Sequence, residues 1–362
     1  MDQRKQPLWI KITFSAILLV LFILISELVL RVVSPDLYQK NQFFPTNRDI
    51  DFVEVYQRDP HLFWRFRPDQ NIHSAQFSFI DYRINKKGMR GPEAELEKKG
   101  MRVLALGNSC TFGWGVKQDA IWTSRLEKTI QKLPGYQNFE IINAGVPGYS
   151  SYQGKIYFET ELLKYKPDVV LIMFGWNDER PAGKNISDHE HKAPPEVVFD
   201  LQNMISKLKL YQFMRKFILS TTEKQEMPRL DQLGSKKRVP LNNFLENLRH
   251  ICHVARQNNI VPVLLIPPIA SVENYFPGQT SYFHKLHQQY QNEIIKAGKY
   301  ENVPVIDLQV PFDEHNDLFT DAADDPTHFN AKGQIIAAGA ILPVLEPILD
   351  SIRTAGSSPA PQ

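Results

Sequence analysis

Cysteine is scarce in this chain, which has only Cys110 and Cys252 among its 362 residues. Two cysteines provide neither a disulfide framework nor a thiolate cluster for zinc, and we interpret both as small buried apolar residues. A His-Glu-x-x-His zinc motif is absent as well. The formal net charge is only +2, so the charge balance does not favour a nucleic-acid partner. We therefore expect no metal, no other cofactor and no bound nucleic acid.

Charge is also missing from residues 12–26, the core of an apolar stretch between residues 8 and 33. The roughly 19 residues from 12 to 30 approach the length of a membrane-spanning helix. A cleaved signal peptide and a buried core helix are the alternatives. Signal peptides usually end at a small-x-small cleavage site, whereas Glu27-Leu28-Val29-Leu30-Arg31 follows here. We therefore favour an uncleaved membrane anchor.

Basic residues precede this apolar stretch. Arg4, Lys5 and Lys11 lie near its N-terminal side, where only Asp2 opposes them. The positive-inside rule then predicts a cytoplasmic N-terminus and a single-pass protein. The remainder of the chain is expected in the periplasm or outside the cell.

A serine follows the short apolar run at residues 103–106. The sequence there is Gly107-Asn108-Ser109, and the glycine lets the backbone turn sharply. A serine hydroxyl is a weak nucleophile at neutral pH and requires an adjacent base. His328 can accept the proton, and Asp325 can orient the imidazole if a turn or one helical turn places both side chains on the same side. The three residues are therefore candidates for a catalytic triad.

Two further motifs follow predicted strands and end in Gly148 and in Asn177-Asp178. A tetrahedral intermediate needs hydrogen-bond donors directed at its oxyanion. The backbone N–H groups of Ser109 and Gly148 and the amide of Asn177 are the candidates. Asp178 would repel an oxyanion, so we expect it to cap a helix or to brace the loop. Trp114 lies near the Ser109 motif and Trp176 precedes Asn177, and both either line the pocket or serve packing.

Two competing motifs do not fit this sequence. An α/β-hydrolase elbow requires Gly-x-Ser-x-Gly, but Thr111 occupies the last position. A P-loop requires a lysine that does not follow Gly113. Over residues 101–350 the chain instead resembles the SGNH family of GDSL-type hydrolases, which is named for Ser, Gly, Asn and His in four sequence blocks.

This resemblance implies a role for each motif. Ser109 corresponds to the family nucleophile, Gly148 and Asn177 to its oxyanion hole, and Asp325 and His328 to its Asp-x-x-His block. The family usually has aspartate before the serine, where this chain has Asn108. That aspartate is not a triad member, so the difference concerns hydrogen bonding in the loop.

Apolar runs at residues 103–106, 139–142, 169–174, 261–266 and 303–306 indicate short buried strands separated by helical stretches. This alternation predicts a flavodoxin-like three-layer α/β sandwich, the SGNH hydrolase fold, with a central parallel sheet. Ligands bind at the carboxyl ends of such strands, which Ser109, Gly148 and Asn177 follow. The predicted regions are a cytoplasmic tip and transmembrane helix at 1–35, a small β-rich connecting region at 36–100, the catalytic domain at 101–353 and a disordered tail at 354–362.

An insertion at residues 179–240 interrupts the catalytic domain. Within it, Asp188-His189-Glu190-His191 has metal-binding residue types, but we favour a solvated loop. The amphipathic residues 204–219 suggest a lid, a basic face near lipid headgroups or a plain covering helix, of which we favour the last. Residues 221–239 are polar and expected to be mobile. For residues 36–100 we favour a packing collar over a platform that shapes substrate access.

Taken together, the sequence predicts a membrane-anchored serine esterase that hydrolyses carboxylic esters through a Ser-His-Asp triad and an acyl-enzyme. The family accepts lipids and acylated sugars, so an ester of either kind is the expected substrate. One alternative is an O-acyltransferase that acts on cell-envelope polysaccharide. The other is a non-enzymatic envelope-assembly or binding protein on the same fold. The complete set of catalytic residue types argues against the second alternative.

Overall fold

The computed structural model describes residues 7–33, 55–74, 80–192, 195–221, 236–270, 280–321 and 325–357. Its centre is a parallel sheet with the strand order β6-β5-β7-β8-β9. The strands are β5 (Arg102–Gly107), β6 (Glu140–Gly145), β7 (Val169–Met173), β8 (Val261–Ile266) and β9 (Val305–Asp307). The chain order reverses at β5, and ligands bind at such a switch point in sheets of this kind.

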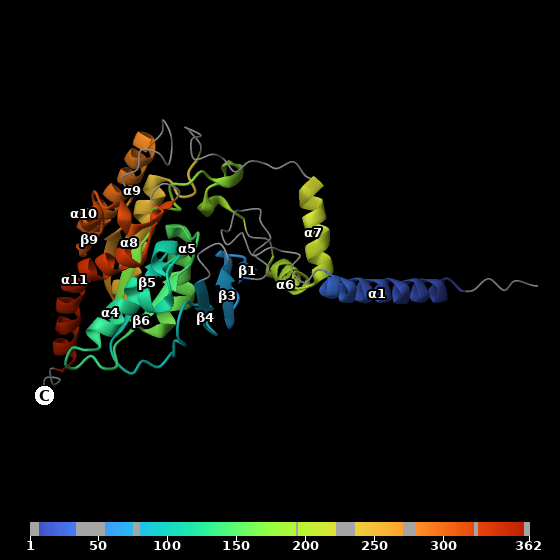
Figure 1. Cartoon of the computed structure of the whole chain (residues 1–362), viewed down its shortest axis with the longest axis horizontal. Coiled ribbons are helices and arrows are strands. Elements are labelled where there is room, and N and C mark those ends of the chain that lie inside the picture. Colours follow the sequence, from blue (N-terminus) through green and yellow to red (C-terminus); the bar gives the residue numbers. More distant parts are fainter. Residues whose placement is uncertain are drawn as a thin grey trace, which may run out of the picture.

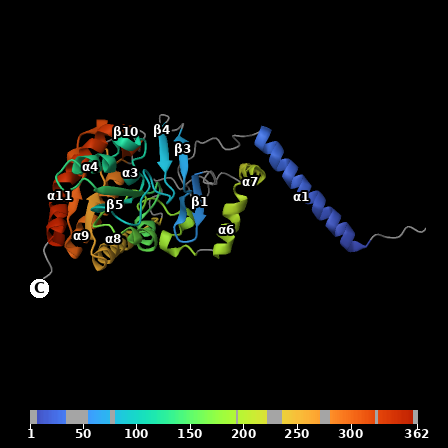
Figure 2. The same ribbon diagram turned by 90° about the horizontal axis from the view of Figure 1, so that it is seen from below.

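Both faces of the sheet are buried because its strands are apolar on both sides. In β5, Leu104 and Leu106 belong to one core, and Val103 and Ala105 belong to the other. The first core includes residues of α5 (Ser151–Tyr157), α8 (Leu241–Gln257) and α9 (Thr280–Glu301), and the second includes residues of α4 (Trp122–Ile130) and α11 (Ala331–Ser357). Helices thus cover both faces (Figures 1 and 2). The predicted flavodoxin-like sandwich is confirmed.

Two short antiparallel hairpins precede the sheet, in agreement with the predicted β-rich region. β1 (Tyr56–Asp59) pairs with β2 (Phe63–Phe66), and β3 (Gln70–Ser74) pairs with β4 (Ile80–Ile84). The rings of Phe66 and Tyr82 pack against Phe112, with centroid separations of 5.4 and 5.2 Å. These contacts are those of a packing collar around the turn after β5.

The N-terminal helix α1 (Leu8–Val33) covers the predicted membrane segment, and none of its 26 residues is buried. At 1.5 Å per residue such a helix extends about 39 Å, which exceeds the thickness of the hydrocarbon core. Residues Ala331–Ala355 of α11 are also long and apolar enough to cross a membrane. However, Ile341, Leu345 and Leu349 of α11 lie in the domain core. Figure 1 shows α1 projecting away from the domain, which makes it the better candidate for a membrane helix.

The insertion between β7 and β8 contains the 3-10 turns η4 (Gly183–Asn185) and η5 (Asp188–Glu190) and the helices α6 (Glu196–Ile205) and α7 (Lys209–Thr221). The covering helix predicted at 204–219 agrees with α7 from Lys209 onward, but its predicted start is wrong because residues 204–205 belong to α6. The helix breaks near Ser206, whose hydroxyl donates to the Asn203 carbonyl at 2.9 Å, and α6 has no buried residue. Residues 222–235 of the predicted mobile segment lie outside the described residues. Residues 236–239 are ordered, because Lys237 forms a β-bridge with Pro181.

The remaining elements lie around the sheet and in the C-terminal part. They are α3 (Ser109–Phe112), η1 (Gln118–Ala120), η2 (Phe158–Leu162), η3 (Leu163–Tyr165), α10 (Gln309–Phe312), η6 (Asn316–Leu318), β10 (Phe319–Asp321) and β11 (Asp325–Phe329). The disordered tail predicted from residue 354 is wrong for its first four residues, which are helical. There the Thr354 hydroxyl bonds the carbonyls of Asp350 and Ser351. Residues 358–362 lie outside the described residues.

Candidate active site

Ser109 occupies the first position of α3, directly after the carboxyl end of β5. The turn between them requires Gly107, because a Cβ there would lie 2.1 Å from Thr111 Oγ1 and 2.6 Å from the Met173 carbonyl oxygen. Asn108 caps the short helix by accepting the Cys110 backbone N–H at 3.0 Å. The serine hydroxyl is therefore presented at the edge of the sheet by a locally determined turn.

His328 and Asp325 come from the opposite end of the chain, on β11 of the β10–β11 hairpin. The Nε2 atom of His328 lies 2.7 Å from Ser109 Oγ, and its Nδ1 atom lies 2.6 Å from Asp325 Oδ2. The segment is a strand rather than the expected turn or helical turn. The two side chains still meet because Asp325 Oδ1 accepts the Thr327 hydroxyl and the His328 backbone N–H, at 2.9 and 3.2 Å.

The three side chains form a hydrogen-bonded series in a largely dry environment. Ser109 is 5% exposed and His328 is 4% exposed. Burial on its own would raise the pKa of Asp325, but the adjacent His328 and the bonds from Thr327 outweigh burial and lower that pKa. The carboxylate is therefore ionised at neutral pH and is placed to stabilise a positive charge on the imidazole.

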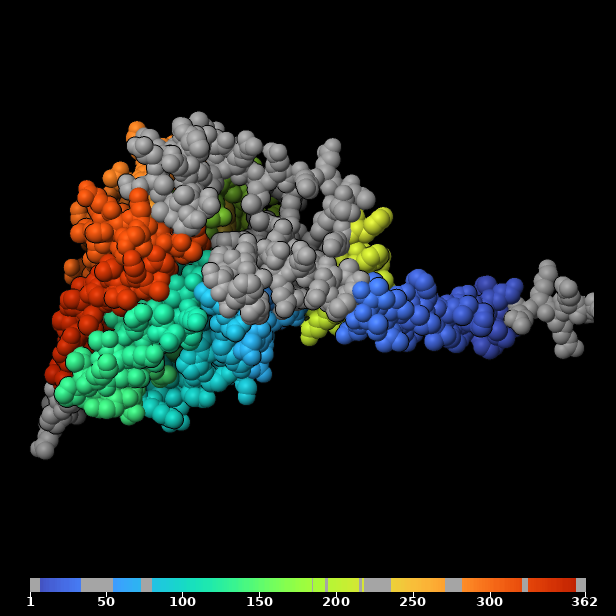
Figure 3. Space-filling model, viewed as in Figure 1, coloured from blue at the N-terminus to red at the C-terminus, as the bar shows by residue number. Residues whose placement is uncertain are grey.

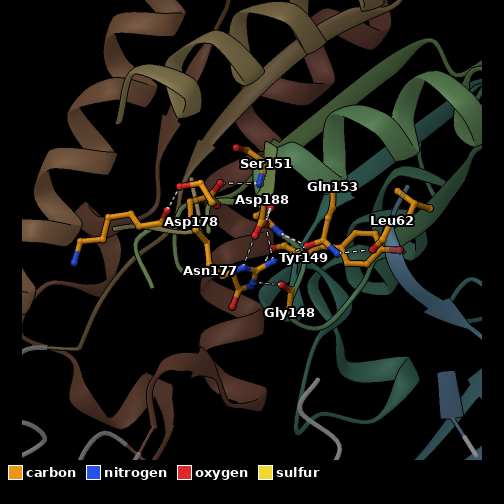
Figure 4. A network of polar contacts seen from close by, with 12 residues as sticks. Leu62, Gly148, Tyr149, Ser151, Gln153, Asn177, Asp178 and Asp188 are labelled. Atoms are coloured by element: carbon orange, nitrogen blue, oxygen red, sulfur yellow. Dashed lines mark hydrogen bonds and ion pairs between the residues drawn. The ribbon is translucent and has the colours of Figure 1, made fainter. Parts of the chain in front are cut away.

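Gly148 and Asn177 follow the two strands on either side of β5. Gly148 precedes Tyr149 in the chain, and Asn177 is hydrogen-bonded to Tyr149. Gly148 adopts φ +82°, a left-handed conformation that glycine accepts without strain. The amide nitrogen of Asn177 donates to the Tyr149 carbonyl at 3.0 Å, and Figure 4 shows Asn177 beside Gly148. Among the described residues, no acceptor is bonded to its second amide N–H. The loops after β5 and β6 are joined as well, because Val146 N–H donates to the Gly107 carbonyl at 3.1 Å.

Asp178, the neighbour of Asn177, is fully buried and directed into the loops. Its two oxygens accept backbone N–H groups of Ser151 at 2.8 Å and of Gly175 at 3.1 Å. Burial raises its pKa to about 7, although the Ser151 bonds and Arg238 act in the opposite direction. The geometry agrees with the expectation that Asp178 braces the loop.

A buried arginine outside all the predicted motifs completes this part of the structure. Arg238 donates to the Gly148 carbonyl at 2.7 Å and pairs with Asp188 through two nitrogens, at 2.8 and 3.1 Å. It also donates to Gln153 at 2.8 Å, and Asp188 accepts the Ser150 hydroxyl at 2.6 Å. Figure 4 shows this network around the Gly148 loop. No local sequence pattern identifies Arg238, which lies in a polar segment.

Three residues of the motif Asp188-His189-Glu190-His191 are exposed, as expected of a solvated loop, whereas Asp188 is buried. Asp188 is 2% exposed, η5 is capped by Ser187, and Glu190 pairs with Lys236. The described residues contain no group of three His, Cys, Asp or Glu side chains suited to a metal ion. Asp188 is thus a buried partner within the insertion, and Glu190 forms an exposed ion pair at its surface.

The two tryptophans near the site also have structural partners. Trp114 is 1% exposed and lies between Tyr82 and His328, with ring centroids 6.2 and 6.1 Å away. Trp176 stacks on His287 at 3.9 Å. Trp114 therefore belongs to the packing beneath the histidine.

Arg90 holds the segment that follows Ser109. This buried guanidinium donates to the carbonyls of Phe112, Gly113 and Val116 at 2.6 to 2.7 Å. Desolvation by burial lowers its pKa to about 10, so the group is charged at neutral pH. The predicted packing collar, residues 36–100, thereby fixes the segment that follows Ser109 through Arg90.

Residues 105–336, more than half of the chain, match the GDSL-like Lipase/Acylhydrolase family. The chain belongs to this family. The resemblance seen in the sequence is thus confirmed. Membership of this family places the GDSL-like protein among the hydrolases of ester bonds.

Among solved structures, a lipase/acylhydrolase from Enterococcus faecalis is 20% identical, with a TM-score of 0.45, over 68% of this chain and 96% of that chain. An acetylxylan esterase from Geobacillus stearothermophilus is 17% identical, with a TM-score of 0.44, over 68% of this chain and 94% of that chain. The uncharacterised lipoprotein YqeF of Bacillus subtilis is 33% identical over 76 residues, which span 21% of this chain and 31% of that protein.

Proposed function

We propose that this GDSL-like hydrolase is a membrane-anchored serine esterase in which Ser109 is the nucleophile. The hydrogen-bonded series from Asp325 through His328 to Ser109, with distances of 2.6 and 2.7 Å, carries the proposal. It is the arrangement required to activate a weak hydroxyl nucleophile. A non-enzymatic role would not require these three side chains to align.

In the first half-reaction Ser109 Oγ attacks the ester carbonyl carbon while His328 Nε2 accepts the hydroxyl proton. Asp325 stabilises the resulting imidazolium and holds its Nδ1–H in place. The tetrahedral intermediate then collapses as the bond to the alcohol oxygen breaks, and His328 donates its proton to that oxygen. Water attacks the acyl-enzyme by the same steps and releases the carboxylic acid and free Ser109.

The negative charge on the former carbonyl oxygen requires donors that are in place before the reaction. We assign the backbone N–H groups of Ser109 and Gly148 and the side-chain amide of Asn177 to this task. The Ser109 N–H belongs to the first turn of α3, where helical N–H groups have no intrahelical acceptor. Asn177 is held by its bond to Tyr149, so one N–H is fixed and the other is oriented with it.

The proposed location follows from α1 and from the charges before it. An apolar helix of 26 residues without a buried side chain is suited to a lipid environment. With Arg4, Lys5 and Lys11 on the cytoplasmic side, the catalytic domain faces the periplasm or the exterior. A lipid or an acylated sugar ester is the proposed substrate class.

The test uses the full-length protein, purified in detergent, with p-nitrophenyl acetate as substrate. Ser109→Ala and His328→Ala should each lower turnover by several orders of magnitude, because triad members act as a unit. Ser351→Ala, on the exposed side of α11, is a matched control that should retain wild-type turnover. Wild-type turnover in folded Ser109→Ala would refute the assigned nucleophile.

A further inference from the structure

Helix α6 exposes its apolar face, whereas a helix that covers a soluble domain buries that face. Val197, Leu201 and Met204 are 70%, 53% and 63% exposed. Their spacing of four and three residues places them on one face, which Leu208 extends just beyond the helix. An apolar face normally packs against a core, and none of the residues of α6 is buried.

The polar residues between these positions make the contacts with the domain. Asn203 accepts the Arg58 backbone N–H and donates to the Arg58 carbonyl, both at 2.9 Å. Arg67 donates to the Ser206 hydroxyl at 3.2 Å. The hydrogen bonds therefore hold α6 on its polar side and direct its apolar face outward.

The next helix, α7, also exposes apolar side chains and contacts α1. Phe213 and Met214 are 46% and 54% exposed. The backbone N–H of Leu210 donates at 2.9 Å to Glu27, near the C-terminal end of α1, and Glu27 also pairs with Arg31 at 2.8 Å. In Figure 1 α7 runs crosswise to α1 at that end, and Figure 3 shows α7 next to that end of α1.

We propose that α6 and α7 lie in the surface of the same bilayer that α1 spans, with their outward apolar face buried at the boundary between headgroups and acyl chains. The proposal rests on the membrane anchor of the proposed function. A helix that crosses the end of a spanning helix lies near the membrane plane, and an interfacial helix immerses its apolar face by about 5–10 Å. Exposed Lys207 and the adjacent Lys209 provide basic groups for anionic headgroups.

This arrangement has a consequence for the enzyme. An anchor formed by α1 alone would leave the catalytic domain on a single tether. Docking through α6 and α7 adds a second contact, which fixes the orientation of the domain relative to the bilayer. The insertion that carries these helices also carries Asp188 and Arg238, which support the Gly148 loop.

The experiment places a fluorescent probe on single cysteines of the full-length protein in vesicles of phosphatidylcholine and phosphatidylglycerol. Leu201→Cys and Met214→Cys report on the proposed surface, and Leu18→Cys reports on α1. Ile335→Cys is the matched control, because Ile335 is a 50% exposed apolar residue on α11. The native Cys110 and Cys252 are buried, which limits their labelling. Retained esterase turnover on a soluble ester verifies the fold of each variant.

Nitroxide-labelled lipid should quench probes at 18, 201 and 214 severalfold and leave the probe at 335 unchanged. Quenching at 18 without quenching at 201 and 214 would overturn the docking proposal while the anchor stands. Absence of quenching at 18 would refute the membrane anchor and therefore also the docking proposal. A probe at 201 that is shielded from water but not quenched by lipid would indicate a second copy of the chain on this face and would also overturn the proposal.

Discussion

Asn177 and Asp178 are adjacent residues with different hydrogen-bond partners. The Asn177 amide is fixed by the Tyr149 carbonyl, while Asp178 is turned into the loops and accepts two backbone N–H groups. The carboxylate is thereby kept from the proposed oxyanion site, where it would repel the developing charge. The geometry favours the amide as the donor and the acid as the brace.

Asn177→Ala should lower turnover by about 100- to 1000-fold, the usual effect of losing one oxyanion donor. The Michaelis constant should change little, because the interaction strengthens mainly in the transition state. Steady-state kinetics on p-nitrophenyl acetate provide the measurement, and a melting curve verifies the fold. Normal turnover in Asn177→Ala, together with a large loss in Asp178→Ala, would reverse the two assignments.

The buried Asp178 should also make stability depend on pH. Its folded pKa of about 7 exceeds the unfolded value of about 3.9, so the folded state binds the proton more tightly. Wild type should therefore lose stability relative to Asp178→Asn as pH rises from about 4 to about 7. The loss should be at most about 1.4 kcal/mol per pH unit. Above about pH 7 the difference in unfolding free energy between the two proteins should stay constant. Urea unfolding of both proteins across this range measures it. A difference independent of pH would mean that Asp178 ionises normally.

At the scale of elements, the insertion between β7 and β8 returns to the domain as residues 236–239 and delivers Arg238 to the Gly148 loop. The guanidinium bonds the Gly148 carbonyl and the Asp188 carboxylate at the same time. Both side chains are largely buried, with 10% and 3% exposure, so solvent screens this pair little. The insertion thus contributes to the position of a loop that we assign to the oxyanion hole.

Arg238→Lys preserves a positive charge near Asp188 but cannot reproduce the fork that reaches Gly148 and Gln153 together. Turnover should fall by about 10- to 100-fold, since small displacements of catalytic groups have effects of this size, and the Michaelis constant should change less. Lys237→Met, at the next residue, is the control and should retain turnover. A lower melting temperature with unchanged turnover in Arg238→Lys would limit Arg238 to a structural role.

At the scale of the whole molecule, α1 and the catalytic domain are distinct in character. The helix buries none of its side chains, whereas the sheet is buried on both faces. The positive charges before α1 predict the direction in which the chain crosses the membrane. The catalytic domain would then meet substrates of the cell envelope.

A reporter that is active only after export should be active when it is fused after Gln362. The full-length chain should be found in the membrane fraction. An alkaline phosphatase fusion tests export, and immunoblotting of fractions tests the length. Exchanging Arg4 and Lys5 for glutamate should weaken the orientation, because the bias depends on basic residues on the cytoplasmic side. A soluble chain that begins near residue 35 would show that α1 is a cleaved signal peptide.

Local sequence patterns were enough to predict the strands of the sheet and the candidate triad. Buried parallel strands are continuous apolar runs, so residues 261–266 were predicted with the bounds that the structure has. Ser109, Asp325 and His328 were identified by residue type, order and spacing, and the fold brings them within hydrogen-bonding distance. These features are encoded locally, in single motifs and short periodic patterns.

Long-range folding, in contrast, sets which polar residues meet across long stretches of chain and which way an amphipathic helix faces. Arg238 and Asp188 are 50 residues apart in sequence, and neither has a local pattern that names its partner. The periodicity of α6 reveals an apolar face but not its direction. That direction depends on Asn203 and Ser206 bonding to distant segments, Arg58 and Arg67, which bring the polar side inward.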